Sequence, residues 1–303
     1  MGITRAVRVT LVANPGSGGE SDPDALAAAL TDRGAEVRLR RIDELAVGGD
    51  GSACDPREGA ERIAEDAPER VVVAGGDGSI ALAAHAAAHA GVPLAVVPTG
   101  TANDFARALD LPPDHDAALA LAADPAARTR RIDLLYADRR PFVNVASAGL
   151  SVVAAQEARP FKRALGALAY GVGAMRAGLS AQPLACRAAI DGRERFAGAV
   201  WQVIVSGTGA FGGGSEVGAA DDDDGLVDLT AVRAGPRARL LLRAFGMRSG
   251  RITGQRGVFH ARGREVVLDV PAGTTFNVDG EVCGCGEPAR FTIRPAAVEV
   301  VVG

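Results

Sequence analysis

Three glycine-rich turns, each directly after a short apolar stretch, constrain the fold of this chain more than any other feature. Residues 7–12, 71–74 and 94–97 have the character of β-strands, and a helical stretch follows each turn. Short continuous apolar runs are typical of buried parallel strands. Repeated strand–turn–helix units predict a doubly wound α/β domain with a parallel sheet. The three turns are Asn14-Pro15-Gly16-Ser17-Gly18-Gly19, Gly75-Gly76-Asp77-Gly78-Ser79 and Pro98-Thr99-Gly100-Thr101.

The pattern changes after about residue 131. Eight stretches in the second half read as strands separated by turn signals, and one helical insert near residues 155–179 interrupts them. This succession predicts a mostly-β sandwich domain. The predicted boundaries are residues 1–131 for the nucleotide-binding α/β domain, completed by residues 293–303, and residues 132–292 for the β-rich domain.

Composition excludes several classes of protein. A formal net charge of −4 over 303 residues argues against a generally basic nucleic-acid-binding protein. Lys162 is the only lysine, so neither a Walker A lysine nor the strand lysine of protein kinases can be assigned. The apolar stretch at residues 164–175 is shorter than the ~20 residues that span a bilayer. The first twelve residues do not resemble a signal peptide, so we expect a cytoplasmic chain that touches a membrane only transiently.

The glycine-rich turns are expected to bind phosphate. Glycine lets backbone N–H groups approach phosphate oxygens, and a helix N-terminus adds partial positive charge. Asp77 and Asp104 lie in or just after two of the turns, where carboxylates would repel phosphate unless a cation intervened. This placement points to Mg²⁺. It is equally open that Asp104 caps a helix and that Asp77 occupies a turn.

Six motifs resemble, in order, those of the diacylglycerol kinase catalytic-domain family, which includes soluble bacterial diacylglycerol kinases and the sphingosine and ceramide kinases. The G-G-D-G turn alone also occurs in NAD kinases and phosphofructokinases, whereas the third and sixth motifs together are specific. The family usually has Thr where Ser79 stands and Pro where Gly218 stands. The motifs are Asn14-Pro15-Gly16-Ser17-Gly18, Gly75-Gly76-Asp77-Gly78-Ser79, Pro98-Thr99-Gly100-Thr101-Ala102-Asn103-Asp104-Phe105-Ala106-Arg107, Phe142-Val143-Asn144-Val145-Ala146-Ser147-Ala148-Gly149, the segment from Gly212 to Asp228, and Val278-Asp279-Gly280-Glu281.

The resemblance implies an α/β domain of the NAD kinase and phosphofructokinase type and a β-rich domain that binds a lipid substrate. It implies that the chain uses ATP and Mg²⁺ to phosphorylate a lipid hydroxyl at a membrane surface, with diacylglycerol or a related lipid as acceptor. It also suggests a homodimer. The residues expected to bind the nucleotide are Asn14, Ser17, Gly18, Gly75, Gly76, Gly78, Ser79, Thr99, Gly100, Thr101, Asn103 and Asp104.

The Val278-Asp279-Gly280-Glu281 motif supplies the candidate catalytic carboxylates. Residues i and i+2 of a strand point to one face, so Asp279 and Glu281 would face the substrate together. Asp279 is the candidate general base for the attacking hydroxyl, and Asp77 is its rival because family members are also interpreted with that aspartate in the role. The alternative for Asp279 and Glu281 is a solvated hairpin turn.

The run Asp221-Asp222-Asp223-Asp224-Gly225 is too acidic to fold tightly without a cation. It does not have the ligand spacing of an EF-hand. The resemblance implies a structural Mg²⁺ site with Asp221, Asp223, Asp224 and the backbone carbonyl near Leu226 as ligands. A solvated acidic turn is the alternative.

An arginine-rich segment, residues 229–264, contains nine arginines and no acidic residue. It could lie against anionic lipid, with the helical insert bordering the acyl-chain entrance, or it could be a solvated edge beside an ordinary core helix. Two other functions stay open. The chain could be an NAD kinase, or a catalytically silent regulator that binds lipid or nucleotide.

Overall fold

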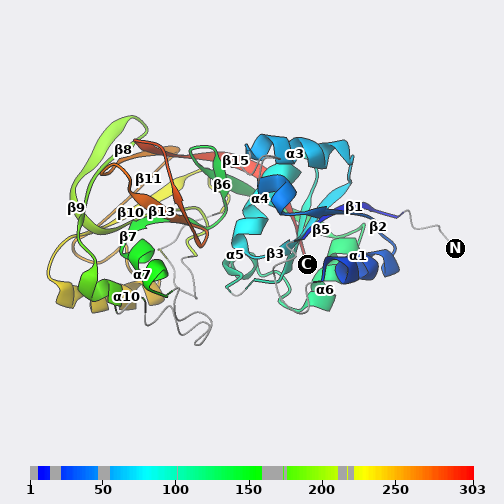
Figure 1. Cartoon of the computed structure of the whole chain (residues 1–303), viewed down its shortest axis with the longest axis horizontal. Helices are drawn as coiled ribbons and strands as arrows, with labels where there is room; N and C mark the ends of the chain where they lie inside the picture. The colour runs from blue at the N-terminus through cyan, green and yellow to red at the C-terminus, as the bar shows by residue number, and fades with distance from the viewer. Residues whose placement is uncertain are drawn as a thin grey trace. The chain divides into compact units, whose positions relative to one another are not determined.

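A computed structural model describes residues 6–13, 22–46, 55–100, 102–158, 173, 176–210, 217 and 222–303 (Figure 1). The contacts between residues divide the chain into two compact units. Unit 1 comprises residues 1–134, 139–143 and 294–303, and unit 2 comprises residues 135–138 and 144–293.

Unit 1 is built on a parallel sheet with the strand order β2-β1-β3-β4. All residues of β3 and β4 are buried, which explains why both strands are nearly continuous apolar runs in the sequence. The α/β fold that the sequence predicts is therefore confirmed. The strands are β1 (Arg8–Ala13), β2 (Glu36–Arg41), β3 (Arg70–Gly75) and β4 (Leu94–Pro98).

Helices cover both faces of this sheet. Leu30 of α1 and Leu119 of α6 belong to the same buried cluster as Leu11 of β1. Figure 1 shows α3 on the other side of these strands, where it packs on α4. The helices are α1 (Pro23–Asp32), α2 (Asp43–Ala46), α3 (Pro56–Glu65), α4 (Asp77–Ala90), α5 (Asp104–Ala108) and α6 (His115–Ala123).

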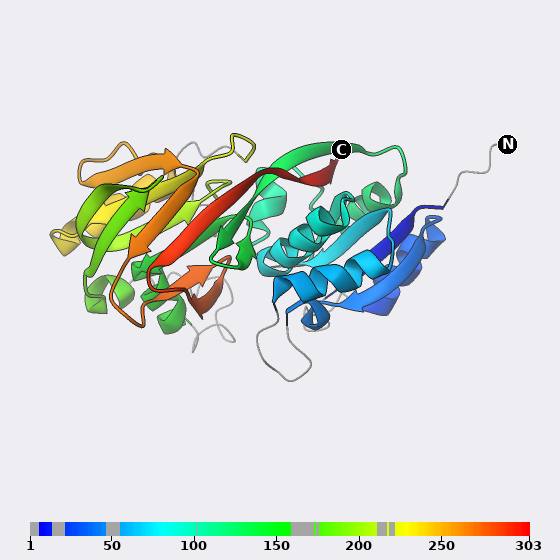
Figure 2. The ribbon, with the colours of Figure 1, turned by 90° about the horizontal axis from the view of Figure 1, so that it is seen from above.

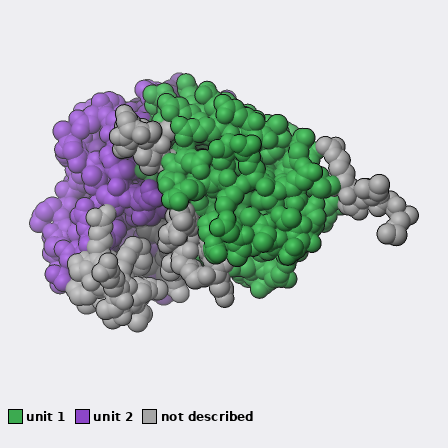
Figure 3. Space-filling view, turned by 45° about the vertical axis from the view of Figure 1, so that its right-hand side comes forward, with its two compact units in different colours: residues 1–134, 139–143, 294–303 green, residues 135–138, 144–293 purple. Residues whose placement is uncertain are grey.

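Unit 2, purple in Figure 3, is organised around the long strand β9 (Arg193–Ser206). The first half of β9 pairs with β8, and its second half pairs with β7 and β10. All of these pairings are antiparallel, so the predicted mostly-β sandwich is confirmed. The other strands are β7 (Val145–Gly149), β8 (Leu184–Ile190), β10 (Val227–Arg233), β11 (Val258–Gly263), β12 (Glu265–Asp269), β13 (Thr275–Val278) and β14 (Glu281–Gly284).

Strand β15 (Ala289–Val302), the long red strand of Figure 2, pairs in both units. Its first residues pair with β12, and Val300 pairs with Leu94 of β4. Strand β5 (Arg128–Ala137) pairs with β15 and with β6 (Arg140–Phe142).

The structure differs from the sequence prediction at four places in the second half. Residues 141–146, one of the eight stretches expected to be strands, belong to two strands, β6 and β7, because Asn144 between them bonds to a side chain instead of continuing a ladder. Helix α10 (Leu240–Arg248) and strand β14 were not predicted. The predicted helical insert begins early, as α7 (Leu150–Ala158), and most of its remainder lies outside the described residues. None of the described helices has both the length and the apolar character needed to cross a bilayer.

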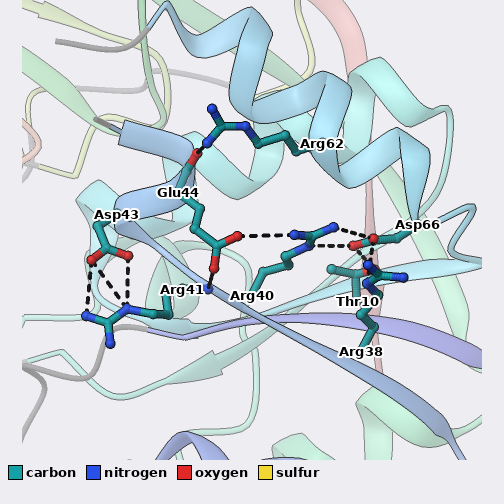
Figure 4. A network of polar contacts seen from close by, with 8 residues as sticks. All are labelled: Thr10, Arg38, Arg40, Arg41, Asp43, Glu44, Arg62 and Asp66. Atoms are coloured by element: carbon teal, nitrogen blue, oxygen red, sulfur yellow. Dashed lines mark hydrogen bonds and ion pairs between the residues drawn. The ribbon is translucent and has the colours of Figure 1, made fainter. Parts of the chain in front are cut away.

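A network of ion pairs links Asp66, at the C-terminal end of α3, to strands β1 and β2 of unit 1 (Figure 4). The Asp66 side chain is 1 % exposed and accepts hydrogen bonds from Nε and Nη2 of Arg40 at 3.0 and 2.6 Å. Nε of Arg38 lies 2.7 Å from the same carboxylate, and the Thr10 hydroxyl donates to it at 3.3 Å. The hydrogen bonds that Arg40 donates to the Asp66 carboxylate raise the pKa of Arg40, so this arginine stays charged.

Replacing Asp66 with Ala is expected to lower the free energy of unfolding by ~2–3 kcal/mol, because the largely covered Arg40 would lose its principal partner. Thermal unfolding followed by circular dichroism measures the change. Asp43→Ala is the matched control, since the Asp43–Arg41 pair is half-exposed and its loss should leave the melting temperature almost unchanged. Equal melting temperatures for the two variants would contradict this account.

Candidate active site

The second and third glycine-rich turns lie against each other at the carboxyl ends of β3 and β4. The N–H of Thr99 donates to the carbonyl of Gly75 at 3.2 Å. A Cβ on Gly100 would lie 2.7 Å from Cα of Gly76, so the two backbones approach more closely than any side chain permits. The second and third turns therefore lie at one edge of the parallel sheet, as expected from the sequence, while the first turn lies outside the described residues.

Asp77 joins these two turns through its carboxylate. Its Oδ1 accepts from the N–H of Phe105 at 2.9 Å, and its Oδ2 accepts from the N–H of Asp104 at 3.3 Å. Asn103, the N-cap of α5, has a left-handed backbone (φ 48°) and makes no side-chain cap. The Asp77 carboxylate therefore caps a helix that begins 27 residues later, which neither of the two sequence hypotheses for Asp77 included.

Asp104 occupies the first turn of α5 and is only 6 % exposed. Its carboxylate forms an ion pair with Arg107, three residues further along the helix. This ion pair places a buried carboxylate and its cationic partner close to the two turns.

Two buried polar atoms beside these turns, Oγ1 of Thr99 and Oδ1 of Asn103, have no hydrogen-bond partner among the residues that the structure describes. A buried oxygen without a partner costs ~1–3 kcal/mol, so a ligand that supplied a partner would gain affinity here. Helix α4 adjoins these turns, with Gly76 as its N-cap, and the N–H groups at the very start of a helix have no intrahelical acceptor. Together these features fit the phosphates of a nucleotide.

The remaining predicted nucleotide-binding residues fall into two groups. Gly75 ends β3, and a Cβ there would lie 2.6 Å from Cβ of Ser79, while Gly78 and Ser79 form the first turn of α4. Four predicted positions lie outside the described residues: Asn14, Ser17, Gly18 and Thr101.

Replacing Gly100 with Ala is expected to weaken ATP binding at least ~10-fold, because the new methyl group would force the two turns apart. Its Cβ would also lie 2.7 Å from Oδ1 of Asn103. Isothermal titration with a non-hydrolysable ATP analogue measures the loss. Gly254→Ala is the matched control, since its Cβ would have one neighbour within 4 Å, at 3.9 Å. Unchanged binding in Gly100→Ala would show that the turns do not hold the nucleotide.

Asp279 lies in a two-residue β-hairpin turn between β13 and β14. Asp279 and Gly280 both have positive φ values, 45° and 89°, as the Asp-Gly turns of tight hairpins do. Oδ1 of Asp279 accepts from the N–H groups of Asn144 and Val145, both at 3.0 Å. The N–H of Asp279 donates in turn to the carbonyl of Val145 at 2.9 Å.

The argument from strand alternation for Asp279 and Glu281 is wrong, because the turn separates them. Glu281 is the first residue of β14 and pairs with Val278 across the hairpin. Its side chain is exposed. The structure places both carboxylates at one hairpin, with Asp279 fixed by backbone bonds.

The sequence analysis assigned no role to Asn144 and Thr208, whose polar groups position the loop that binds the Asp279 carboxylate. Asn144 is 3 % exposed, and its Oδ1 accepts from the Thr208 hydroxyl at 3.0 Å. Its carbonyl accepts from the N–H of Gly207 at 3.2 Å. The bonds to Thr208 and Gly207 fix the loop whose N–H groups bind Asp279. The Phe142-Val143-Asn144 motif was the available signal for Asn144, whereas nothing in the sequence marks Thr208.

The acidic turn differs from the expected metal site. One oxygen of Asp224 accepts from the N–H of Leu226 at 2.9 Å, and the other pairs with Arg262. Arg262 also bonds to the fully buried Asp228. Asp223 is exposed, and Asp221 lies outside the described residues. Arginine thus supplies the positive charge near Asp224, and no group of three or more candidate ligands occurs within the described ranges.

Comparison with known protein families matches both halves of the chain. Residues 8–137 match the diacylglycerol kinase catalytic domain. Residues 144–302 match the YegS C-terminal NAD kinase beta sandwich-like domain. The first match includes Asp77 and Asp104, and the second includes Asn144 and Asp279.

Relatives with assigned names agree with these matches. A "Diacylglycerol kinase" of Mycobacterium tuberculosis is 29% identical over 97% of this chain and 94% of its own length. A "Probable lipid kinase YegS-like" protein of Pseudomonas aeruginosa is 32% identical over 97% of this chain and 93% of its own. The same name is carried by a Pseudomonas fluorescens protein that is 34% identical over 80% of this chain and 81% of its own.

A solved structure supports the fold. The crystal structure of a diacylglycerol kinase from Bacillus anthracis str. Sterne superposes with a TM-score of 0.74 at 18% identity, covering 99% of this chain and 98% of the other. The family resemblance drawn from the six motifs is confirmed. This chain belongs to the diacylglycerol kinase and YegS-like family and is a lipid kinase.

Proposed function

We propose that this kinase transfers the γ-phosphate of ATP, with Mg²⁺, to the hydroxyl of diacylglycerol or a related lipid. The observation that carries the proposal is the pair of packed glycine turns with two unsatisfied buried oxygens beside a helix N-terminus. The names of the M. tuberculosis and P. aeruginosa relatives support a lipid acceptor.

The donor and acceptor character of each group indicates which part of the nucleotide it would meet. The N–H groups at the start of α4 and the Thr99 hydroxyl can donate to phosphate oxygens. Oδ1 of Asn103 can only accept, so it suits a cation or a water bound to one. When bound, Mg²⁺ would neutralise phosphate charge. The described part of the acidic turn does not fit a second magnesium ion while Arg262 pairs with Asp224, and no step is assigned to one.

In this proposal Asp279 is the general base. It takes the proton from the lipid hydroxyl, whose oxygen forms a bond to the γ-phosphorus while the bond to the departing ADP oxygen breaks. General base catalysis contributes ~10²–10⁴-fold, and positioning with charge neutralisation supplies most of the rest. Asp77 instead positions the phosphate-binding turns, because both of its oxygens accept backbone N–H groups.

The test is phosphate transfer from labelled ATP into mixed micelles that contain one hydroxyl lipid at a time. The panel contains diacylglycerol, phosphatidylglycerol, a glycolipid and a sphingoid base, with NAD as a soluble acceptor. The expected result is transfer of label to a lipid, and this transfer should require Mg²⁺. Label in NAD would identify an NAD kinase, and ATP binding without any transfer would identify a silent regulator. Either outcome would overturn the proposal.

A further inference from the structure

Helix α10 of unit 2 presents apolar side chains to solvent. Leu242 is 57 % exposed and Phe245 is 69 % exposed. These two residues, three apart, share one face of the helix with the exposed Ser249. The opposite face contains Arg243, which is only 9 % exposed. The usual arrangement of a surface helix, apolar inward and charged outward, is thus inverted at these positions.

The inverted orientation is fixed by Gln255. Its Oε1 accepts from Nη1 of Arg243 at 2.7 Å, and its Nε2 donates to the carbonyl of Leu242 at 3.0 Å. A Cβ on Gly246 would lie 2.1 Å from Nε2 of Gln255, so any larger residue there would displace the Gln255 side chain from these bonds. Turning the helix to bury Leu242 and Phe245 would break these bonds. Their exposure therefore follows from specific packing.

A third exposed apolar residue is held beside the start of α10. Leu179 is 77 % exposed. Arg237, in the 3₁₀ turn η2 (Arg237–Arg239) that leads into α10, donates to the carbonyls of Gly178 and Ala181 at 2.9 and 2.8 Å. These bonds bracket Leu179. Leu179, Leu242 and Phe245 are called the α10 patch below.

Positive charge surrounds the α10 patch. Arg239, Arg251 and Arg256 are exposed, and none of the three forms an ion pair with an acidic side chain in the described part of the chain. A pocket of about 160 Å³ lies at the start of α10, lined by Trp201 and three arginines and by no acidic residue. Those arginines are Arg233, Arg239 and Arg243. Exposed apolar side chains beside unpaired arginines complement a surface that has acyl chains beneath anionic phosphates.

We propose that the α10 patch docks this kinase onto an anionic lipid bilayer. Leu179, Leu242 and Phe245 enter the boundary between headgroups and acyl chains. Arg239 and Arg251 face the headgroup phosphates, and the arginine-lined pocket accepts one phosphate. The role of this docking rests on the proposed function, because a lipid kinase must reach a substrate held in a membrane. The binding itself does not depend on catalysis.

The test is flotation of the full chain with vesicles, without ATP. Vesicles of phosphatidylcholine with about 30 mol% phosphatidylglycerol, which gives the surface a negative potential, are compared with pure phosphatidylcholine. The wild type should bind the anionic vesicles. Leu242→Ser with Phe245→Ser should weaken binding at least ~10-fold, because two apolar side chains leave the interface. Arg239→Gln and Arg251→Gln should each weaken it ~5-fold and reduce its salt sensitivity.

Matched controls separate docking from general effects. Arg195→Gln removes an exposed arginine from the β8–β9 hairpin, whose turn lies at the other end of unit 2 from α10 in Figure 1, and should leave binding unchanged. Phe245→Leu should restore most of the binding that Phe245→Ser loses. Circular dichroism confirms that each variant is folded.

Three results would overturn the proposal. The first is that the wild type does not bind anionic vesicles, and the second is that the Leu242→Ser, Phe245→Ser variant binds them as well as the wild type. The third is that the wild type is a dimer and this variant is a monomer, which would assign the patch to contact with a second copy of the chain. Phosphate transfer to a short-chain lipid below its micellar concentration is measured separately. If that transfer fails in the wild type, the proposed function fails, while the vesicle measurement still decides the docking.

Discussion

Replacing Asp279 with Asn is expected to remove nearly all lipid phosphorylation while the fold and ATP binding persist. The substitution keeps the shape of the side chain and removes its negative charge, and a neutral amide cannot take a proton from a hydroxyl. A fall of kcat by ~10²–10⁴-fold with little change in the KM for ATP is the expected signature.

The hairpin should tolerate this change. Asparagine is among the residues that adopt positive φ most readily, and Asp279 has φ 45°. The amide oxygen of Asn can still accept from the N–H groups of Asn144 and Val145. Asp279→Ala would lose both bonds and place a Cβ without local support at a positive φ, so it tests structure and catalysis together.

The chain contains a matched control for this substitution at Asp191. Asp191 and Gly192 form a second two-residue hairpin turn with φ values of 49° and 75°. Oδ1 of Asp191 accepts from Arg264 N–H at 2.9 Å and Glu265 N–H at 3.0 Å, and its own N–H donates to the Glu265 carbonyl at 3.0 Å. Asp279 makes the same set of bonds, so this geometry alone does not identify a catalytic residue.

Asp191→Asn should therefore keep full activity with the same small change in melting temperature as Asp279→Asn. Initial rates with saturating ATP and the best lipid acceptor, together with thermal unfolding, provide both readouts. If Asp279→Asn retains more than half of the wild-type rate, Asp279 has only the structural role that Asp191 has, and another group is the base.

Local patterns predicted the elements of the fold well, because each element carries its own signal. Strands β3 and β4 are buried apolar runs, and α1 and α3 both begin with an Asp cap followed by Pro. The sequence did not predict α10, where three leucines, a phenylalanine and two arginines give no ordinary amphipathic pattern. The inverted burial of Arg243 depends on Gln255, a contact that periodicity cannot show.

The sequence motifs predicted which residues lie at the candidate site, but they predicted the roles of those residues less well. The six motifs identified Asp77, Asp104 and Asp279, but the carboxylates of Asp77 and Asp279 act through partners distant in sequence. Asp279 and Asn144 are separated by 135 positions. The Asp279-Gly280 pair is itself a hairpin signal, and the hairpin turn that the sequence analysis gave as the alternative is the local structure found here. The ion pair of Arg262 with Asp224 had no local signal at all.

Replacing Asp77 with Asn is expected to weaken ATP binding and lower stability, while turnover of the remaining complex changes far less. Each oxygen of Asp77 accepts a different N–H, from Phe105 and from Asp104. The single amide oxygen of an asparagine can accept from one of these N–H groups. Its NH₂ group would then face the other N–H, and two donors cannot bond to each other. The lost charge-assisted bond and the unsatisfied N–H together should cost ~2–3 kcal/mol of stability.

Losing the Asp77 cap should affect ATP binding as well as stability, because α5 begins beside the proposed nucleotide site. Asn103 and the unsatisfied oxygen that it presents come directly before the helix, so loosening the first turn of α5 displaces the proposed nucleotide site. We expect the Kd for ATP to rise at least ~10-fold, by analogy with the cost of a single misplaced binding group. Asp114→Asn is the matched control, since Asp114 caps α6 with one bond, to Ala117 N–H at 2.8 Å.

Asp114→Asn should lose ~1 kcal/mol of stability and bind ATP normally. Titration with the non-hydrolysable analogue and thermal unfolding measure both quantities in the two variants. The opposite pattern in Asp77→Asn, normal ATP affinity with a collapsed kcat, would make Asp77 the general base and Asp279 a structural hairpin residue. The two aspartates are therefore distinguished by which constant each substitution changes, because a positioning carboxylate acts on affinity and stability and a base acts on kcat.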